Sequence, residues 1–503
     1  MTVVVNRRSD LTLDSYRRVA LESEDVTIGP VAREAMTAAR AGFTALLDSD
    51  RAAVIYGVTT RPGVEVSTPI PAGRQRGYAR AALAESPHGF GGGWHDEEVI
   101  RGVVFARLAD LVEGHAKVRP EVAVRVAGLL RAPMPPVPLD GQAGPGEVLP
   151  MLQIMRAVAD LDLEEGEGMG LINGSPYSSA VLADAAIRAR NRLRHAERIF
   201  ALSIDAFRAP LDAYDEEFGG LWGDEHQAAA LASIRGHLDG TDAAGRLPHQ
   251  APVSFRVVPR LLGEARRAVA GAERAAAIAL RSVSVNPVYL PPDPAHPLGR
   301  VVSNGGFHNA MACPVLQSLS SAWAELALLA ERQVAAFHRG STYQLPPLLS
   351  PAGFQDDAPG GATNLFGWSV TGYVESARAA AAPTLTPAVV ADTQNDVCTA
   401  TALAHRKQRQ AADALDGALA ILAVVASQAL FVTGREPAPG LAGLAAGVRS
   451  VFPPVNRALR RDQGAEAGQL AEVIAAGART GRLDFPAAAR GRTEAGAAGG
   501  EAG

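Results

Sequence analysis

The sequence predicts a mainly α protein built on long bundled helices, with a smaller, loop-rich N-terminal region. Apolar residues recur at helical spacing, with few glycines, over four long stretches, residues 181–206, 262–283, 315–337 and 399–432. Strand-like stretches such as residues 53–56 are short and scattered. Aromatic residues make up only 5% of the chain and alanine is abundant, which suits close helix packing and a GC-rich bacterial gene.

Breaks rich in polar residues, glycine or proline separate these stretches. They fall at residues 57–75, 86–95, 132–147, 284–312 and 343–364. Functional residues concentrate in such connecting segments. We therefore expect residues 1–205 to carry the active-site loops and residues 206–486 to form the central bundle and the C-terminal helices. Residues 487–503 are low-complexity sequence without a hydrophobic face, and this composition predicts a disordered tail.

Composition argues against several classes of partner. The formal charge is −5, from 48 basic and 53 acidic residues, and no basic block marks a nucleic-acid site. No hydrophobic signal core begins the chain, and the apolar run at residues 418–432 is interpreted as a core helix. Cys313 and Cys398 are predicted to be buried thiols in a reducing cytoplasm. No histidine, aspartate or glutamate cluster has metal-ligand spacing.

Six short segments in or beside these connecting breaks contain the candidate functional residues. They read YGVTT from Tyr56, GQAGPGEVLP from Gly141, LINGS from Leu171, SVNP from Ser284, GGFH from Gly305 and QLPP from Gln344. In order and separation they resemble the characteristic loops of the histidine/phenylalanine ammonia-lyase family, over about residues 11–485. Each motif alone is weak, but six in register indicate the fold.

The resemblance implies an ammonia-lyase-like long-helix bundle, of the fumarase/aspartase-like superfamily architecture. It also implies a homotetramer whose active sites are shared among three subunits. The helices expected near residues 315–337 and 399–432 would form its central bundle. Members of this family build an electrophile, 4-methylideneimidazole-5-one (MIO), by cyclising an Ala-Ser-Gly segment of their own chain.

The loop that should build this electrophile is altered. In place of Ala-Ser-Gly the chain has Ala143, Gly144, Pro145 and Gly146, with one residue fewer than the family pattern. No serine or threonine lies between residues 140 and 150, so the methylidene has no precursor. Proline also lacks an N–H group and fixes φ, which opposes ring closure. We therefore predict that the protein has no MIO group and needs no cofactor.

Other family positions are also changed. In the family's QDxYSxR pattern the chain keeps Gln250 and Arg256 but has Val253 in place of the tyrosine. A late acidic position of the family corresponds to Asn395. Ammonia elimination of the family's kind would therefore lack its electrophile, one phenol and one carboxylate.

The retained residues still suit proton transfer. Tyr56 resembles the family's catalytic base, which needs a nearby cation such as Arg256 because the pKa of an ordinary tyrosine is about 10. Asn173 and Arg256 resemble groups that position the substrate, and Phe307 resembles an aromatic wall of the pocket. The resemblance also places four further residues around the substrate, namely Gln250, His88, Asn395 and Gln344.

Each of these residues also has a structural interpretation. Tyr56 can be a packing phenol, Asn173 a helix cap and Arg256 a member of an ion pair. His88 and His95 share a glycine-rich segment, a lid or a loose loop, and either can face the site. Asp140 and Glu147 are interpreted as solvated loop acids, with a redesigned carboxylate site as the alternative.

Three interpretations of the function remain, and the first two belong to different classes. The preferred hypothesis is an MIO-independent lyase- or cyclase-type enzyme, in which Tyr56 performs elimination or addition, isomerisation or cyclisation on a small intermediate of bacterial specialised metabolism. The alternative is a catalytically inactive homologue that acts as a binding or scaffold subunit. An amino acid ammonia-lyase or aminomutase with an unconventional prosthetic group is a third interpretation.

Overall fold

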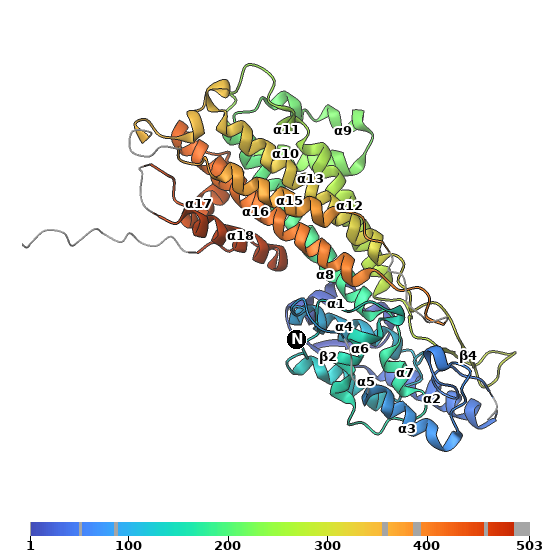
Figure 1. Ribbon diagram of the computed structural model, residues 1–503. Coiled ribbons are helices and arrows are strands. Elements are labelled where there is room, and N and C mark those ends of the chain that lie inside the picture. Colours follow the sequence, from blue (N-terminus) through green and yellow to red (C-terminus); the bar gives the residue numbers. More distant parts are fainter. Residues whose placement is uncertain are drawn as a thin grey trace, which may run out of the picture. The chain divides into compact units, whose positions relative to one another are not determined.

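The computed structural model describes residues 2–49, 53–84, 89–354, 361–385, 394–456 and 461–486 (Figure 1). The predicted tail at residues 487–503 lies outside these ranges. The chain divides into two compact units, each made of three separate segments. Unit 1 comprises residues 1–190, 267–321 and 380–411, and unit 2 comprises the remainder. This division differs from the expected single boundary at residue 205, because long helices contribute residues to both units.

The four predicted long helices are confirmed. They are α8 (Pro176–Ala206), α12 (Val258–Ala279), α13 (Ala312–His338) and α16 (Thr401–Thr433). Helix α8 begins earlier than predicted because Pro176 suits the first turn of a helix, where its missing N–H is not needed. The mainly α fold class is therefore correct.

Unit 1 combines shorter helices with two small sheets. Strands β1 (Thr2–Val5) and β2 (Asp25–Ile28) pair in parallel, and β3 (Val288–Leu290) and β4 (Arg300–Val302) pair antiparallel. The helices before α8 are α1 (Leu13–Tyr16), α2 (Pro30–Ser49), α3 (Ala72–Ala84), α4 (Glu97–Leu111), α5 (Pro120–Gly128), α6 (Val148–Met155) and α7 (Glu167–Ile172). Helix α4 is buried from Val99 to Leu111, which makes it the central helix of this unit.

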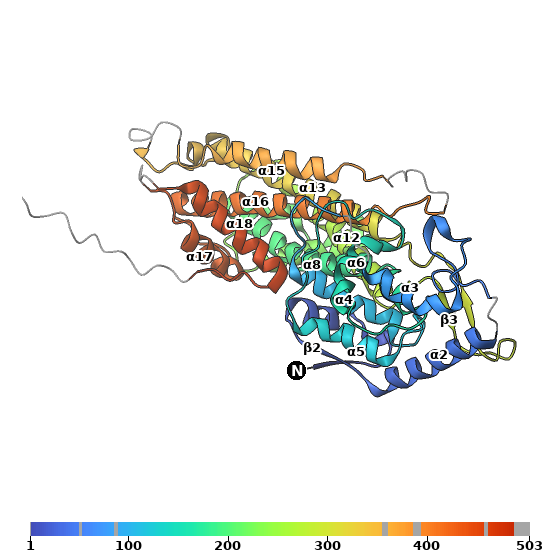
Figure 2. The same ribbon diagram turned by 60° about the horizontal axis from the view of Figure 1, so that its bottom comes forward.

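Unit 2 is entirely helical in the part of the chain that the structure describes. Besides the long helices it contains α9 (Glu217–Trp222), α10 (Glu225–Leu238), α11 (Val253–Arg256), α15 (Phe366–Ala381), α17 (Ala442–Val451) and α18 (Gln463–Thr480). Helices α13, α15 and α16 lie side by side in both ribbon views (Figure 1, Figure 2). Its core includes a buried ion pair in which Arg192 Nε and Nη2 each lie 2.8 Å from an Asp416 carboxylate oxygen.

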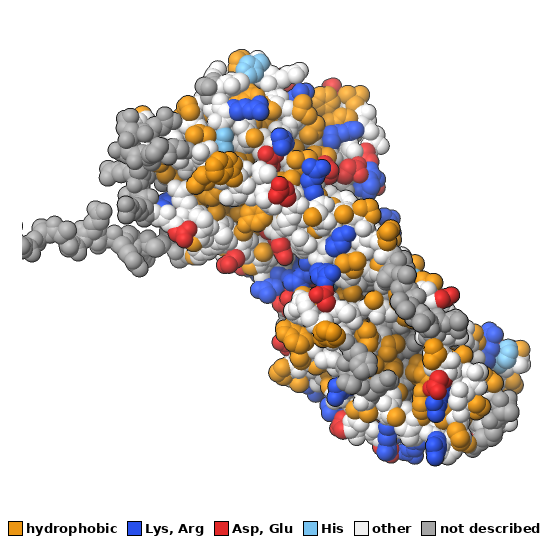
Figure 3. All heavy atoms as spheres, in the orientation of Figure 1, with side chains coloured by type: hydrophobic (Ala, Val, Ile, Leu, Met, Phe, Trp, Pro, Cys, Tyr) orange, Lys and Arg blue, Asp and Glu red, His pale blue; other side chains and the backbone are white. Residues whose placement is uncertain are grey.

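Helix α16 is the one described helix that is long and apolar enough to cross a membrane by length and composition. In its most apolar window, 89% of the residues are buried inside the protein, as expected for a core helix. On the face seen in Figure 3, basic and acidic side chains are interspersed, in line with the nearly balanced charge. Cys398 is buried as predicted, whereas Cys313 is only half-buried.

Candidate active site

A cavity of about 590 Å³ in unit 1, here called the Tyr56 cavity, brings together five of the six motif segments. Its lining comes from residues 56–63, α3, residues 143–152, residues 169–173, residues 286–307 and residues 394–395. Apolar side chains such as Leu152 and Met169 alternate with hydroxyl and carboxamide groups. None of its described lining residues is Asp, Glu, Lys, Arg or His.

Tyr56 lines the cavity at the start of a tight turn. Three successive N–H groups, of residues 58, 59 and 60, donate to the carbonyl oxygen of Ile55. Gly57 has φ +67°, and a Cβ there would lie 2.4 Å from Met169 Cγ, so only glycine fits. The Gly63 N–H donates a 2.9 Å hydrogen bond to the Tyr56 phenolic oxygen.

The altered loop runs along one wall of the cavity. Ala143, Gly144 and Pro145 line it, and Gly144 forms a single antiparallel bridge to Thr399. Pro145 opens a short 3₁₀ turn, Pro145–Glu147, that leads directly into α6. Gly146, with φ +66°, accepts a 3.2 Å hydrogen bond from the Gly174 N–H. The loop is therefore an ordered turn at the start of a helix.

Glu147 corrects the interpretation of a solvated loop acid. Its side chain is buried, and its carboxylate oxygens lie 3.0 and 3.1 Å from the Ser178 backbone N–H. The Ser178 hydroxyl also donates to this carboxylate and lies 2.9 Å from Thr401 Oγ1. Burial raises the pKa of Glu147 to about 7, against the lowering effect of the Ser178 donors. Asp140 is the less buried acid of the two, half-buried and paired with Arg406.

Asn173 lies between α7 and α8 and lines the cavity. Arg107, fully buried, donates a 2.9 Å hydrogen bond to the Asn173 carbonyl oxygen and fixes the backbone there. The residue is only 7% exposed, yet its side-chain Oδ1 has no hydrogen-bond partner among the described residues. Because a helix cap would accept a backbone N–H at this oxygen, Asn173 does not cap α8.

The remaining predicted residues of unit 1 divide into two groups. Phe307 and Asn395 line the Tyr56 cavity, as the resemblance implied. His88 lies outside the described residues. His95 lies within the protein rather than on the cavity wall, with its Nε2 3.2 Å from the Tyr177 hydroxyl and its ring stacked 5.8 Å from His405. Burial lowers the pKa of His95 to about 4.

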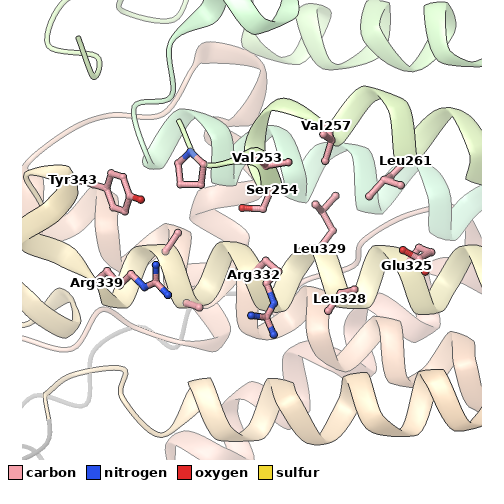
Figure 4. Close-up of a pocket in the computed structure, with 13 residues that line it drawn as sticks. Val253, Ser254, Val257, Leu261, Glu325, Leu328, Leu329, Arg332, Arg339 and Tyr343 are labelled. Carbon is pink, nitrogen blue, oxygen red and sulfur yellow. The ribbon is translucent and has the colours of Figure 1, made fainter. Parts of the chain in front are cut away.

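Arg256, Gln250 and Gln344 belong to unit 2 and do not line the Tyr56 cavity. Arg256 and Gln250 line a separate hollow of about 600 Å³, and Arg256 Nε donates to the Ala251 carbonyl oxygen. Gln344 has φ +56° and accepts a hydrogen bond from Arg208 at its backbone oxygen. Figure 4 shows a second, mostly apolar hollow of about 350 Å³ between residues 252–261 and α13, where Val253 is 60% exposed.

Sequence reasoning missed several cavity residues. Asn286, Ser303 and Asn304 lie in or beside the quoted motifs, but the motifs alone assign them no role. Asn286 Oδ1 accepts from the Asn304 N–H at 2.8 Å and from the Ser303 hydroxyl at 3.3 Å. Tyr78, a second phenol in the cavity, lies on α3, where no motif marks it. The motif spacing could have drawn attention to Asn286 and Asn304, but nothing in the sequence could have identified Tyr78.

The altered loop does not suit the MIO group that the resemblance implies. Pro145 offers no N–H, and no hydroxyl side chain lies in the loop to become the methylidene. The backbone is instead committed to the turn Pro145–Glu147 and to the bridge between Gly144 and Thr399. No group of three or more metal-ligating side chains occurs in the part of the chain that the structure describes.

Comparison with known proteins places this geometry in context. The family described as aromatic amino acid lyase matches residues 11–159 and 155–450 of the chain. The histidine ammonia-lyase of Streptomyces griseus is 29% identical over 496 residues, covering 90% of this chain and 92% of that protein. The histidine ammonia-lyase of Geobacillus sp. strain WCH70 is 26% identical over 487 residues, covering 90% and 93%.

Solved structures show the same fold. Tyrosine aminomutase from Streptomyces globisporus superposes with a TM-score of 0.83 at 22% identity, covering 95% of this chain and 98% of that one. Ergothionase from Treponema denticola gives 0.84 at 17% identity, covering 95% and 99%. Histidine ammonia-lyase from Trypanosoma cruzi gives 0.79 at 20% identity, covering 98% and 100%.

Proposed function

The chain belongs to the aromatic amino acid lyase family, and we propose that it is an enzyme that uses this scaffold without the MIO electrophile. Tyr56 would act as its general acid or base on a small organic substrate. The observation that carries the proposal is the combination of two features in one cavity. The loop has no residue from which MIO can form, whereas Tyr56 keeps a hydrogen-bonded phenolic oxygen on the cavity wall.

The compatible reactions are elimination or addition across an activated C–C bond, isomerisation and intramolecular cyclisation. Each begins or ends with one proton transfer at carbon, which a positioned phenol can perform. Without an internal electrophile, the amino group of a free amino acid has no route to becoming a good leaving group. The proposed substrate is therefore a pre-activated intermediate, as in bacterial specialised metabolism. The enzyme is proposed to be cytoplasmic and to bind neither nucleic acid nor membrane.

The proposed role of Arg256 depends on the assembly of several subunits. It lies in unit 2, and the described lining of the Tyr56 cavity in unit 1 contains no cation. In the homotetramer that the family resemblance implies, a neighbouring subunit would supply Arg256, with Gln250, to a shared site. A guanidinium there would bind a substrate carboxylate and help Tyr56 to lose its proton.

Deletion of the gene in the source strain, followed by metabolite profiling, tests the function. Complementation with wild type should restore the missing metabolite, and Tyr56→Phe should not, although it folds and assembles like wild type by circular dichroism and size-exclusion chromatography. Restoration by both would instead support a binding or scaffold subunit that needs no catalysis. An intact mass two waters below the chain mass would restore the MIO-dependent alternative.

A further inference from the structure

Asn286 lines the Tyr56 cavity, and one of its two polar side-chain atoms has no partner in the protein. Its Oδ1 accepts hydrogen bonds from the Asn304 N–H at 2.8 Å and from the Ser303 hydroxyl at 3.3 Å. These donors fix which end of the carboxamide is the oxygen, so the other end is the Nδ2 donor. Nδ2 donates no hydrogen bond to any described residue, although Asn286 is only 6% exposed. The cavity therefore has a donor of fixed orientation on its wall.

Buried groups hold the backbone on both sides of Asn286. Before it, the N–H groups of Ser284 and Val285 donate to Asp110 Oδ1 at 2.5 and 2.9 Å. After it, Lys117 donates from Nζ to the carbonyl oxygen of the next residue. Asp110 is 1% exposed and Lys117 is fully buried. A donor held this firmly loses little freedom when it binds a ligand, which suits a group that selects a substrate.

Asn173 supplies the complementary group in the same cavity. Its Oδ1 is an acceptor that has no partner among the described residues, and the residue is 7% exposed. Buried polar groups are nearly always hydrogen-bonded, so this oxygen calls for a donor from a ligand. The described lining contains no charged side chain. A carboxylate would bring no N–H to this oxygen, and burial of its charge between neutral walls would be unfavourable.

We propose that Asn286 determines substrate specificity, and that the substrate group held between it and Asn173 is a neutral amide, as in a carboxamide or a lactam. Asn286 Nδ2 donates to the amide carbonyl oxygen, and the amide N–H donates to Asn173 Oδ1. This proposal rests on the proposed function, because it takes the Tyr56 cavity as the substrate site. The amide is a different group of the substrate from the carboxylate that Arg256 would bind.

The variant Asn286→Asp tests this role, because it keeps the oxygen that binds Asn304 and Ser303 and replaces only the donor. Benzamide and benzamidine are matched probes of the same shape, and benzamidine is a cation that has donors but no acceptor. At pH 8 the full-length wild type should bind benzamide about tenfold more tightly than benzamidine, the effect of one hydrogen bond and of an unpaired donor. Asn286→Asp, ionised at this pH, should reverse the preference. Isothermal titration calorimetry measures both dissociation constants.

Asn6→Asp is the matched control. Asn6 Oδ1 also accepts a backbone N–H, that of Val31 at 3.2 Å, but Asn6 does not line the cavity. The control should therefore leave both dissociation constants unchanged. An equal loss of both probes in Asn286→Asp would indicate a purely structural role for Asn286 and would overturn the proposal, and so would unchanged benzamide binding.

The wild type also tests the proposal without any variant. Benzamidine binding as tight as that of benzamide, or no benzamide binding at millimolar concentration, would overturn it. The failure of the proposed function is a separate result. If Tyr56→Phe restores the metabolite, the acid–base role of Tyr56 is wrong, whatever the probes show. If Tyr56→Phe does not restore it and the probe preference is absent, only the amide specificity fails.

Discussion

The Glu147 carboxylate accepts the backbone N–H of Ser178 at 3.0 Å, and this contact ties the altered loop to the first turn of α8. A carboxylate at a helix N-terminus is electrostatically favourable. Its complete burial is not, and this conflict is why the pKa of Glu147 rises to about 7. The loop is therefore held by a group that changes charge near neutral pH.

The first prediction concerns the pH dependence of stability at Glu147. The folded-state pKa of Glu147 is raised from 4.5 to about 7. Its contribution to the free energy of unfolding is therefore fully present below pH 4.5 and is lost as pH rises through 7. Glu147→Gln cannot ionise, so its free energy of unfolding relative to wild type should rise by about 3 kcal/mol between pH 4.5 and 8. Urea unfolding at both pH values measures this difference, and a constant difference would contradict it.

The second prediction concerns the stacked pair His95 and His405, whose contribution to stability changes with pH in the opposite direction to that of Glu147. Burial lowers the pKa of His95 to about 4 and that of His405 well below its usual value, aided by the nearby Arg409. Their contribution to the free energy of unfolding is therefore fully present above pH 6.5, and it is lost as pH falls through the lowered folded-state pKa values. His405→Leu, which replaces a ring whose nitrogens have no described partner, should lose less stability than wild type between pH 7 and 5. Equal losses in parallel urea titrations would show that the pair does not titrate on unfolding.

The third prediction tests the turn that presents Tyr56. Gly57→Ala places a Cβ against Met169 at a positive φ, so it should destabilise the protein by about 1–3 kcal/mol. Gly77→Ala is the matched control, because it lies within α3, where an added Cβ would meet no atom within 4 Å. Alanine is the better helix former, and the control should gain about 0.5–1 kcal/mol. Equal effects of the two substitutions in urea unfolding would contradict a tight turn at Gly57.

The fourth prediction concerns the core of unit 2. Asp416→Ala leaves Arg192 buried without its bidentate partner, and should cost about 3 kcal/mol or more. The exposed pair Arg61 and Glu65 provides the comparison, since Glu65→Ala should leave the free energy of unfolding nearly unchanged. Both variants can be measured by urea unfolding followed by far-UV circular dichroism. A small effect at Asp416 would mean that water or another group compensates Arg192.

Much of the architecture could be predicted because apolar residues repeat at helical spacing within each long helix. The apolar repeat of α16 indicates a buried helix wherever its neighbours lie, and the same holds for α8, α12 and α13. Tyr56, Asn173, Phe307 and Asn395 were found through motif order, and one cavity contains all four. These were properties that neighbouring residues in the sequence could specify.

What could not be predicted depends on contacts between distant segments. Glu147 was interpreted as a solvated acid because its loop is rich in glycine and proline, but it is buried and bonded to Ser178 of α8, which in turn contacts Thr401 of α16. Arg256 was predicted to lie near Tyr56, and the two residues belong to different compact units of one chain, so that prediction depends on the assembly and stays a prediction. Tyr78 reaches the cavity through the direction of α3, which no motif records. Burial by distant segments determines the environment of these residues, and the neighbouring sequence does not specify that burial.

The turn that begins at Pro145 also limits how the chain could change in future. A serine at that position would not by itself recreate the family's Ala-Ser-Gly segment, because the loop is one residue shorter than the family pattern and Glu147 has a left-handed conformation, with φ +49°, inside the protein. It would also need an inserted residue and the loss of Pro145, which opens the 3₁₀ turn that leads into α6. Recreating the family's Ala-Ser-Gly segment in this loop would therefore take more than one mutation.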